Sequence, residues 1–183
     1  PDDYAAMDRQ MERRGRLMDE TLDLLHRSWA GEAVTGDDVP VGPAPANGNR
    51  VSVLIGGTSD ASVRRTVSYA EGWTSGGGGP ERAAPMIEKV RRAWAEAGRE
   101  GEPRIAALVY FGLTDPDVSR ASLRQYYGFL GDWTEMIVEG AVRTPQAVKD
   151  IARQFADLGV TEIAFDPTVP ALEEIDRLAD AVL

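Results

Sequence analysis

Residues 51–62 (VSVLIGGTSDAS) join a short apolar run to the start of a helical pattern, and this junction decides the fold class. The first five residues are apolar and mostly β-branched, which is typical of a fully buried strand. Gly56 and Gly57 end the run, and the apolar spacing that follows predicts a helix over residues 59–70. A buried strand that leads directly into a helix is the repeating unit of parallel α/β proteins.

The same alternation continues to the end of the chain. After a short element at 72–75, the pattern predicts strands at 104–113 and 160–165. The predicted helices cover residues 80–97, 116–140 with breaks near Gly128 and Gly131, 144–158 and 170–183. Three or four such units predict an α/β fold with parallel strands. They are too few to close an eight-stranded barrel, and composition alone leaves open a doubly wound sheet or the C-terminal part of a barrel.

The residues before this region predict a helix and then a loop. Apolar positions recur at helical spacing over residues 8–30, and Gly31 follows as a helix stop. Residues 35–50 (TGDDVPVGPAPANGNR) are rich in Gly, Pro, Asn and Asp and predict a loop. Too little chain precedes this loop to fold alone, so we expect a single domain over residues 1–183.

Composition excludes several classes of function. The chain has 183 residues with a net charge of −10, so it lacks the basic surface that nucleic-acid binding needs. It has no cysteine and one histidine, His26, which excludes thiol catalysis, a structural metal site and a Ser-His-Asp triad. No apolar run reaches the ~20 residues of a membrane helix and no secretory signal is visible, so we expect a cytoplasmic protein that does not contact a membrane.

The turn after the first strand is the strongest candidate site. Gly56 and Gly57 let the backbone approach a ligand closely, and the following helix start offers N–H groups beside hydroxyls at 58, 59 and 62. This combination suits a phosphate. An ordinary helix cap by Ser59 or Asp60 explains the same residues, and the Asp60 carboxylate favours that interpretation, although Arg64 and Arg65 offset its charge.

A second candidate is Trp73-Thr74-Ser75 with the four glycines at 76–79. We interpret this segment as a mobile loop beside a pocket, or as a surface connection with Trp73 in the core. The other strand ends add further polar and aromatic side chains, although Asp166 before a proline is typical of a turn rather than of a general base. These side chains are Tyr110, Phe111, Asp166 and Thr168.

Seven short strings resemble the bacterial-luciferase-like superfamily, whose members are flavin- or deazaflavin-dependent oxidoreductases and monooxygenases. They occur in the family's order: RRGRLMDE at 13–20, LDLL at 22–25, WAGE at 29–32, VLIGGTS at 53–59, YAEGW at 69–73, AGR at 97–99 and FDP at 165–167. The family fold is a (β/α)8 barrel, so the resemblance implies that this chain is the C-terminal part of a TIM barrel.

The resemblance also implies a cofactor, FMN or coenzyme F420, and a small-molecule substrate. In relatives the Gly-Gly turn holds the phosphate-bearing tail, and residues at the next strand line the pocket. The implied tail residues are Gly56, Gly57, Thr58, Ser59, Ala61 and Ser62, and the implied pocket residues are Trp73 and Thr74. In many deazaflavin-dependent relatives the catalytic histidine lies upstream of the region that this chain resembles, so no catalytic residue is assigned here. Residues 35–50 lack the aromatic-rich stretch of many relatives, which leaves the substrate pocket undefined.

Three functions follow from these patterns. The first is an oxidoreductase that transfers a hydride, or uses flavin–oxygen chemistry, on an organic substrate. The second is a non-catalytic half-barrel that serves as a binding or assembly module. The third is another barrel enzyme that acts on a sugar phosphate. A half-barrel exposes apolar edges and faces, so we expect a homo-oligomer, most simply a dimer.

Overall fold

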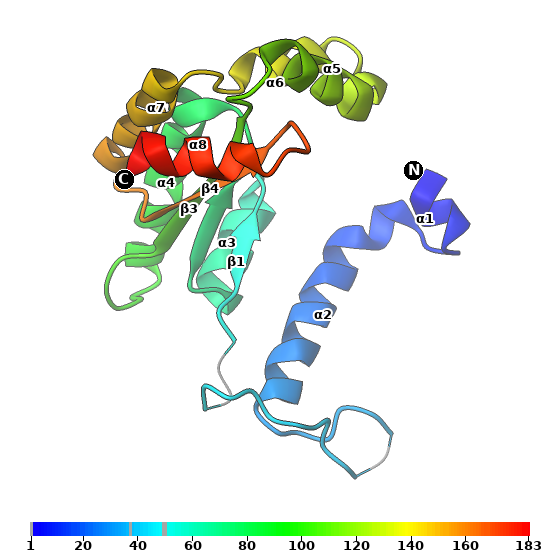
Figure 1. Cartoon of the computed structure of the whole chain (residues 1–183). Coiled ribbons are helices and arrows are strands. Elements are labelled where there is room, and N and C mark those ends of the chain that lie inside the picture. Colours follow the sequence, from blue (N-terminus) through cyan, green and yellow to red (C-terminus); the bar gives the residue numbers. More distant parts are fainter. Residues whose placement is uncertain (1, 37, 49–50) are drawn as a thin grey trace.

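The structure, a computed structural model, describes residues 2–36, 38–48 and 51–183 (Figure 1). Four parallel strands form one sheet in the order β1-β2-β3-β4, which is also their order in the chain. Their bounds are β1 Leu54–Gly56, β2 Gly72–Ser75, β3 Arg104–Phe111 and β4 Glu162–Pro167. Ile55 pairs with Trp73 and Trp73 with Ile105, so these three side chains lie on the same face of the sheet.

Helices connect the strands and precede the sheet. Before β1 lie α1 (Asp2–Ala6), a short 3₁₀ helix (Met11–Arg13) and α2 (Arg14–Trp29). The other helices are α3 (Asp60–Tyr69), α4 (Gly79–Glu96), α5 (Pro116–Tyr127), α6 (Trp133–Gly140), α7 (Pro145–Asp157) and α8 (Glu173–Val182). A 3₁₀ turn at Gly128–Leu130 separates α5 from α6, as the glycines predicted. The α/β fold with parallel strands is therefore confirmed.

Local sequence explains where these helices begin. Prolines occupy the first turn of α4, α5 and α7, where a missing N–H costs nothing. The side chains of Ser59, Asp115 and Thr144 cap α3, α5 and α7 by accepting hydrogen bonds from N–H groups two or three residues ahead.

The main core lies between one face of the sheet and helices α3, α4, α7 and α8. Trp73, Ile105 and Phe111 point into it from the strands and are at most 2% exposed. On the opposite face, alternate residues such as Thr74 and Leu108 are only half-buried. One face of the sheet is thus packed by helices, whereas the other is partly open.

Two predicted elements differ most from the structure. The helix expected over 8–30 is interrupted at Asp8, which has a φ of 53°, and α2 begins only at Arg14. The first strand covers 54–56 rather than 51–55, and of its side chains only that of Ile55 is fully buried. The prediction of a strand buried on both faces was wrong because its second face has no covering layer here.

Most of the predicted loop at 35–50 has no helix or strand, and its residues 37, 49 and 50 lie outside the described part of the chain. Within the described ranges, no helix combines the length and the apolar content that crossing a membrane requires.

Candidate functional site

The Gly-Gly turn lies at the carboxyl end of β1, directly before α3. Residues 56–60 are exposed, whereas Ile55 below them is buried. Gly57 has a φ of +104°, a conformation that side chains other than glycine rarely adopt, and a Cβ placed there would lie 3.4 Å from the Ser62 Cβ. The turn therefore leaves an open, glycine-lined surface in front of the helix start.

Ser59 caps α3 while the turn stays accessible. The Ser62 backbone N–H donates to the Ser59 Oγ over 3.2 Å, and the Ser62 hydroxyl donates to the Ser59 carbonyl over 2.7 Å. The Ser62 side chain is buried and committed to this bond, so Ser62 contributes to the turn's shape rather than a free hydroxyl. Ser59 is therefore a helix cap, as the second interpretation predicted, and phosphate binding by the turn stays a prediction.

The charge of Asp60 is balanced by a neighbouring helix. The Lys89 ammonium on α4 donates to the Asp60 carboxylate, and this hydrogen bond, together with the positive charges of Lys89 and Arg64, lowers the pKa of Asp60. The sequence objection that Asp60 repels an anion is therefore weakened by Lys89, a residue that sequence reasoning did not connect to the site.

Trp73 contacts the Gly-Gly turn from the core side of the sheet. Its side chain is 2% exposed, lies in the main core and donates from Nε1 to the Gly57 carbonyl over 2.9 Å. Thr74 points to the opposite face, where its Cγ2 would lie 3.6 Å from a Cβ at Gly56. The structure thus brings both residues to the turn, Trp73 as a core support and Thr74 on the open face.

Three of the four glycines after β2, Gly77, Gly78 and Gly79, line a cavity, and Trp73 lies in the core as the second interpretation expected. The cavity has an empty volume of about 590 Å³, part of it open to solvent, and lies between this loop, the end of β3 and α6. Tyr110 from β3 and Tyr127 from α5 reach its wall and hydrogen-bond to each other through their hydroxyls. Burial and the bond to Tyr127 raise the pKa of Tyr110, so its phenol stays protonated at neutral pH.

The remaining strand-end residues separate into two groups. Asp166 is exposed and lines a second cavity together with Tyr110, Tyr126 and Tyr127. Phe111 is fully buried, and Thr168 donates to its carbonyl over 2.8 Å, so these two residues belong to the packing of the strand ends.

Sequence reasoning missed a buried carboxylate, Glu174 in the first turn of α8. It is 0% exposed and accepts hydrogen bonds from the backbone N–H groups of Leu113 (2.7 Å) and Thr114 (2.9 Å) and from the Thr114 hydroxyl. Burial opposes ionisation of Glu174, but these hydrogen bonds outweigh it and lower the pKa. An acidic residue in a first helical turn is too common a pattern to have revealed this role.

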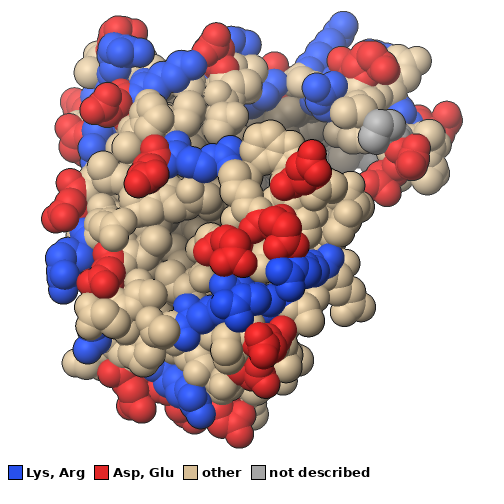
Figure 2. Space-filling view, turned by 90° about the horizontal axis from the view of Figure 1, so that it is seen from above, with Lys and Arg blue, Asp and Glu red and all other residues tan. Residues whose placement is uncertain are grey.

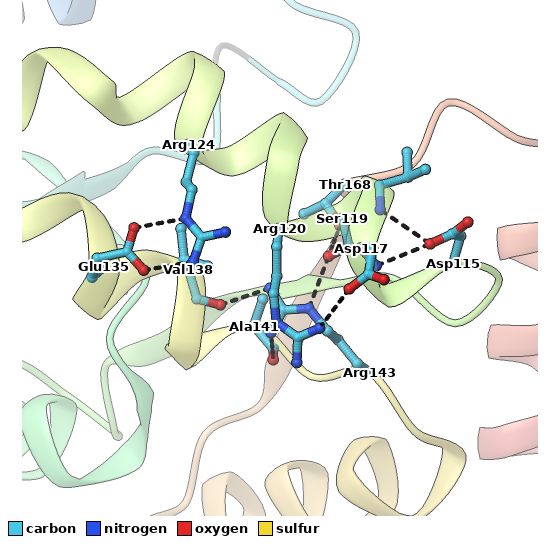
Figure 3. A network of polar contacts seen from close by, with 11 residues as sticks. Asp115, Asp117, Ser119, Arg120, Arg124, Glu135, Val138, Ala141, Arg143 and Thr168 are labelled. Atoms are coloured by element: carbon cyan, nitrogen blue, oxygen red, sulfur yellow. Dashed lines mark hydrogen bonds and ion pairs between the residues drawn. The ribbon is translucent and has the colours of Figure 1, made fainter.

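A second missed feature is the polar network around Arg143 (Figure 3). The guanidinium donates to the carbonyls of Val138 (2.6 Å) and Ala141 (3.0 Å) and to the Ser119 hydroxyl (3.1 Å). On the other side of the α5–α6 pair, Arg124 binds Glu135 through two hydrogen bonds of 2.7 and 2.8 Å. These contacts hold α5 and α6 together above the carboxyl end of β3.

The face seen in Figure 2, from above the view of Figure 1, carries charges of both signs interspersed with uncharged surface. His26, near the end of α2, packs against the rings of Trp29 and Tyr69. No group of three or more potential metal ligands lies in the described part of the chain.

Comparison with solved structures identifies the fold. An F420-dependent secondary alcohol dehydrogenase in complex with an F420–acetone adduct superposes with a TM-score of 0.72 at 14% identity, covering 95% of this chain and 62% of that chain. A riboflavin lyase with modified FMN and riboflavin has a TM-score of 0.67 at 13% identity, covering 98% and 59%. The EDTA monooxygenase of Chelativorans sp. BNC1 has a TM-score of 0.60 at 15% identity, covering 93% and 59%. The four-stranded parallel sheet and its helices therefore resemble part of the TIM barrel of such enzymes.

Sequence comparison agrees with the structural one. Two uncharacterized proteins, from Mycobacterium tuberculosis and Mycobacterium bovis, are 32% identical over 127 residues, which is 66% of this chain. The chain spans less than half, 43%, of the length of these curated relatives. The sequence model described as luciferase-like monooxygenase matches residues 1–164. The chain therefore belongs to the luciferase-like monooxygenase family.

Proposed function

We propose that this chain is the part of an FMN- or F420-dependent oxidoreductase that holds the phosphate-bearing tail of the cofactor. The observation that carries the proposal is the exposed Gly56-Gly57 turn at the start of α3. A positive φ at Gly57, the N–H groups at the start of α3 and the pairing of the Asp60 charge with Lys89 together fit a phosphate. Solved structures with similar folds are described as F420-dependent or as containing modified FMN.

The residues of this chain would bind and orient the cofactor. The phosphate would lie against the backbone of Gly56 and Gly57. It would accept hydrogen bonds from the α3 N–H groups and from the Thr58 and Ser59 hydroxyls. Trp73 fixes the Gly57 carbonyl and keeps the turn in shape. When bound, the cofactor supplies the hydride or flavin–oxygen chemistry. We propose a small organic molecule as substrate and the cytoplasm as location, and we assign no catalytic residue to this chain.

Thermal unfolding with FMN and, separately, with F420 tests the tail site. A ligand that binds only the folded state stabilises it by about 2.7 kcal/mol at 100 times its Kd. For a domain of this size, each kcal/mol raises the Tm by about 2–4 °C. We expect a shift with one of the two cofactors, and we expect Ser59→Asp to abolish it because the new carboxylate repels the phosphate while still capping α3.

The matched control is Ser68→Asp, which adds the same charge at an exposed position near the other end of α3. It should leave the cofactor-dependent shift intact. If neither cofactor raises the Tm of the unmodified chain, or if Ser59→Asp retains the full shift, the turn does not hold a cofactor tail.

A non-catalytic assembly module is the second candidate function, favoured by apolar surface on α8. Leu172, Ile175 and Val182 are 87%, 54% and 49% exposed, and the spacing of these residues places them on one side of the segment. An exposed apolar stripe of this kind, along one side of a helix, is typical of a helix that packs against another element. We propose that two copies of the chain associate through it.

Light scattering after gel filtration measures this association. We expect a mass about twice the 19.8 kDa of one chain. In Ile175→Lys we expect the mass to shift toward that of one chain, because a charge on this apolar surface opposes its burial. Asp176→Lys, at the neighbouring exposed position, serves as the control and should keep the dimer. A mass of one chain for the unmodified protein contradicts the proposal.

A further inference from the structure

The cavity beside the glycine loop has one positive charge and no negative one. Arg82, in the first turn of α4, lines it, and no Asp or Glu lies among its described lining residues. The chain as a whole has 30 acidic and 20 basic residues, so a cavity without carboxylates is unusual for this surface. The local charge favours an anion.

Arg82 has no carboxylate partner within ion-pair distance among the described residues. Instead its Nη1 lies 3.0 Å from the Met136 sulfur, and its guanidinium carbon lies 5.6 Å from the centre of the Trp133 ring. Neither neighbour neutralises the charge. Helix α4 also begins without a side-chain cap at Gly78, so its first N–H groups add partial positive charge near the same place.

The rest of the cavity wall is largely apolar. Leu108, Ile137 and Ile151 line it from β3, α6 and α7. The hydroxyls of Tyr110 and Tyr127 share one hydrogen bond, which leaves one O–H free to donate to a ligand. This is the composition of a small-molecule site, with apolar walls and a few polar groups that fix orientation.

The absence of side chains at Gly77 and Gly78 allows the loop to lie against Tyr110 and Arg82. A Cβ at Gly78 would lie 3.1 Å from the Arg82 Cδ, and one at Gly77 would lie 3.5 Å from the Tyr110 ring. On the other side, the Arg143 network (Figure 3) holds α5 and α6 in place. These helices carry the cavity residues Tyr127 and Met136. Both walls are therefore held by specific contacts.

From these observations we infer that the cavity binds an organic acid with an apolar body, its carboxylate at Arg82 and its chain against Leu108, Ile137 and Ile151. A phosphate is a poorer ligand because the walls are mostly apolar and offer one cation. That this acid is the substrate rests on the proposed function, whereas the site itself does not depend on it.

Isothermal titration with sodium hexanoate and with 1-hexanol, its uncharged analogue, tests the site on the whole chain without cofactor. We expect hexanoate to bind at least about tenfold (about 1.4 kcal/mol) more tightly than the alcohol, because hydrogen bonds between charged groups are stronger than those of a neutral hydroxyl. Lengthening the acid from butanoate to hexanoate should tighten binding about threefold to fourfold per methylene.

Arg82→Gln should weaken hexanoate binding about tenfold and leave hexanol unchanged. Arg92→Gln, which removes the same charge from an exposed position of α4 outside the cavity, should bind like the unmodified chain. Circular dichroism establishes that both variants are folded.

Equal binding of hexanoate and hexanol, no binding of either, or equal effects of the two substitutions would each overturn the inference. The Tm shift with FMN or F420 is measured separately, so a failure of the acid site and a failure of the cofactor site are distinguishable.

Discussion

Replacing Gly72 by alanine is expected to destabilise the fold by about 3 kcal/mol or more, at the upper end of overpacking effects. A Cβ at this position would lie 1.7 Å from the Arg104 carbonyl oxygen and 2.7 Å from its nitrogen. Both are backbone atoms of the neighbouring strand β3, so no side chain can move aside. Strand β2 therefore has to shift. It carries Trp73, which lies in the core and donates a hydrogen bond to the Gly57 carbonyl. Chemical denaturation followed by circular dichroism measures the loss.

The control is Gly76→Ala, in the loop that follows the same strand. A Cβ at Gly76 meets nothing within 4 Å, and its φ lies outside the left-handed region. Its stability should therefore change by less than about 1 kcal/mol. Equal stabilities for the two variants would show that β2 does not lie against β3 as described.

Replacing Glu174 by alanine is the second change with a large expected effect. The substitution removes the acceptor of two backbone N–H groups and of the Thr114 hydroxyl, all at the carboxyl end of β3. A buried donor left without a partner costs about 1–3 kcal/mol, so we expect a loss of about 3 kcal/mol. Glu173→Ala, at the exposed neighbouring position, should cost less than about 0.5 kcal/mol. Similar losses in both variants would contradict the role of Glu174.

Glu174 also predicts a pH dependence. Its pKa is lowered in the folded state, so its carboxylate contributes stability above the ordinary glutamate pKa of about 4.3. That contribution is lost as the pH falls through the folded-state pKa. The difference in unfolding free energy between the unmodified chain and Glu174→Gln should therefore be largest near pH 7. It should decrease as the pH falls below about 4. A difference that stays constant across this range would show that the carboxylate is not ionised in the folded state.

Much of the fold could be predicted because its signals are local. The apolar run at 104–113, the prolines at helix starts and the glycine breaks at 128 and 131 each act within a few residues, and they predicted β3, α5, α6 and α7 closely. The helix at 8–30 was less accurate, because the backbone at Asp8 turns into a positive φ that no local pattern indicated.

The candidate site was predictable only in part. The Gly56-Gly57 turn and its Ser59 cap follow from short-range spacing, and the structure places them where expected. Lys89 reaches Asp60 from 29 residues away, and Met136 reaches Arg82 from 54 residues away. Contacts between such distant residues depend on how helices pack on the sheet, and one sequence carries no local signal for them.

The sequence by itself determined the family, the parallel α/β fold and the position of the Gly-Gly turn, because periodicity, turn residues and short motifs are properties of neighbouring residues. Only the tertiary structure decided that Trp73 lies in the core, that Glu174 is a buried acceptor and that Arg82 faces a cavity without a carboxylate. The physical reason is that burial and charge balance depend on packing between segments far apart in the chain. The same local pattern is compatible with a buried or with an exposed side chain.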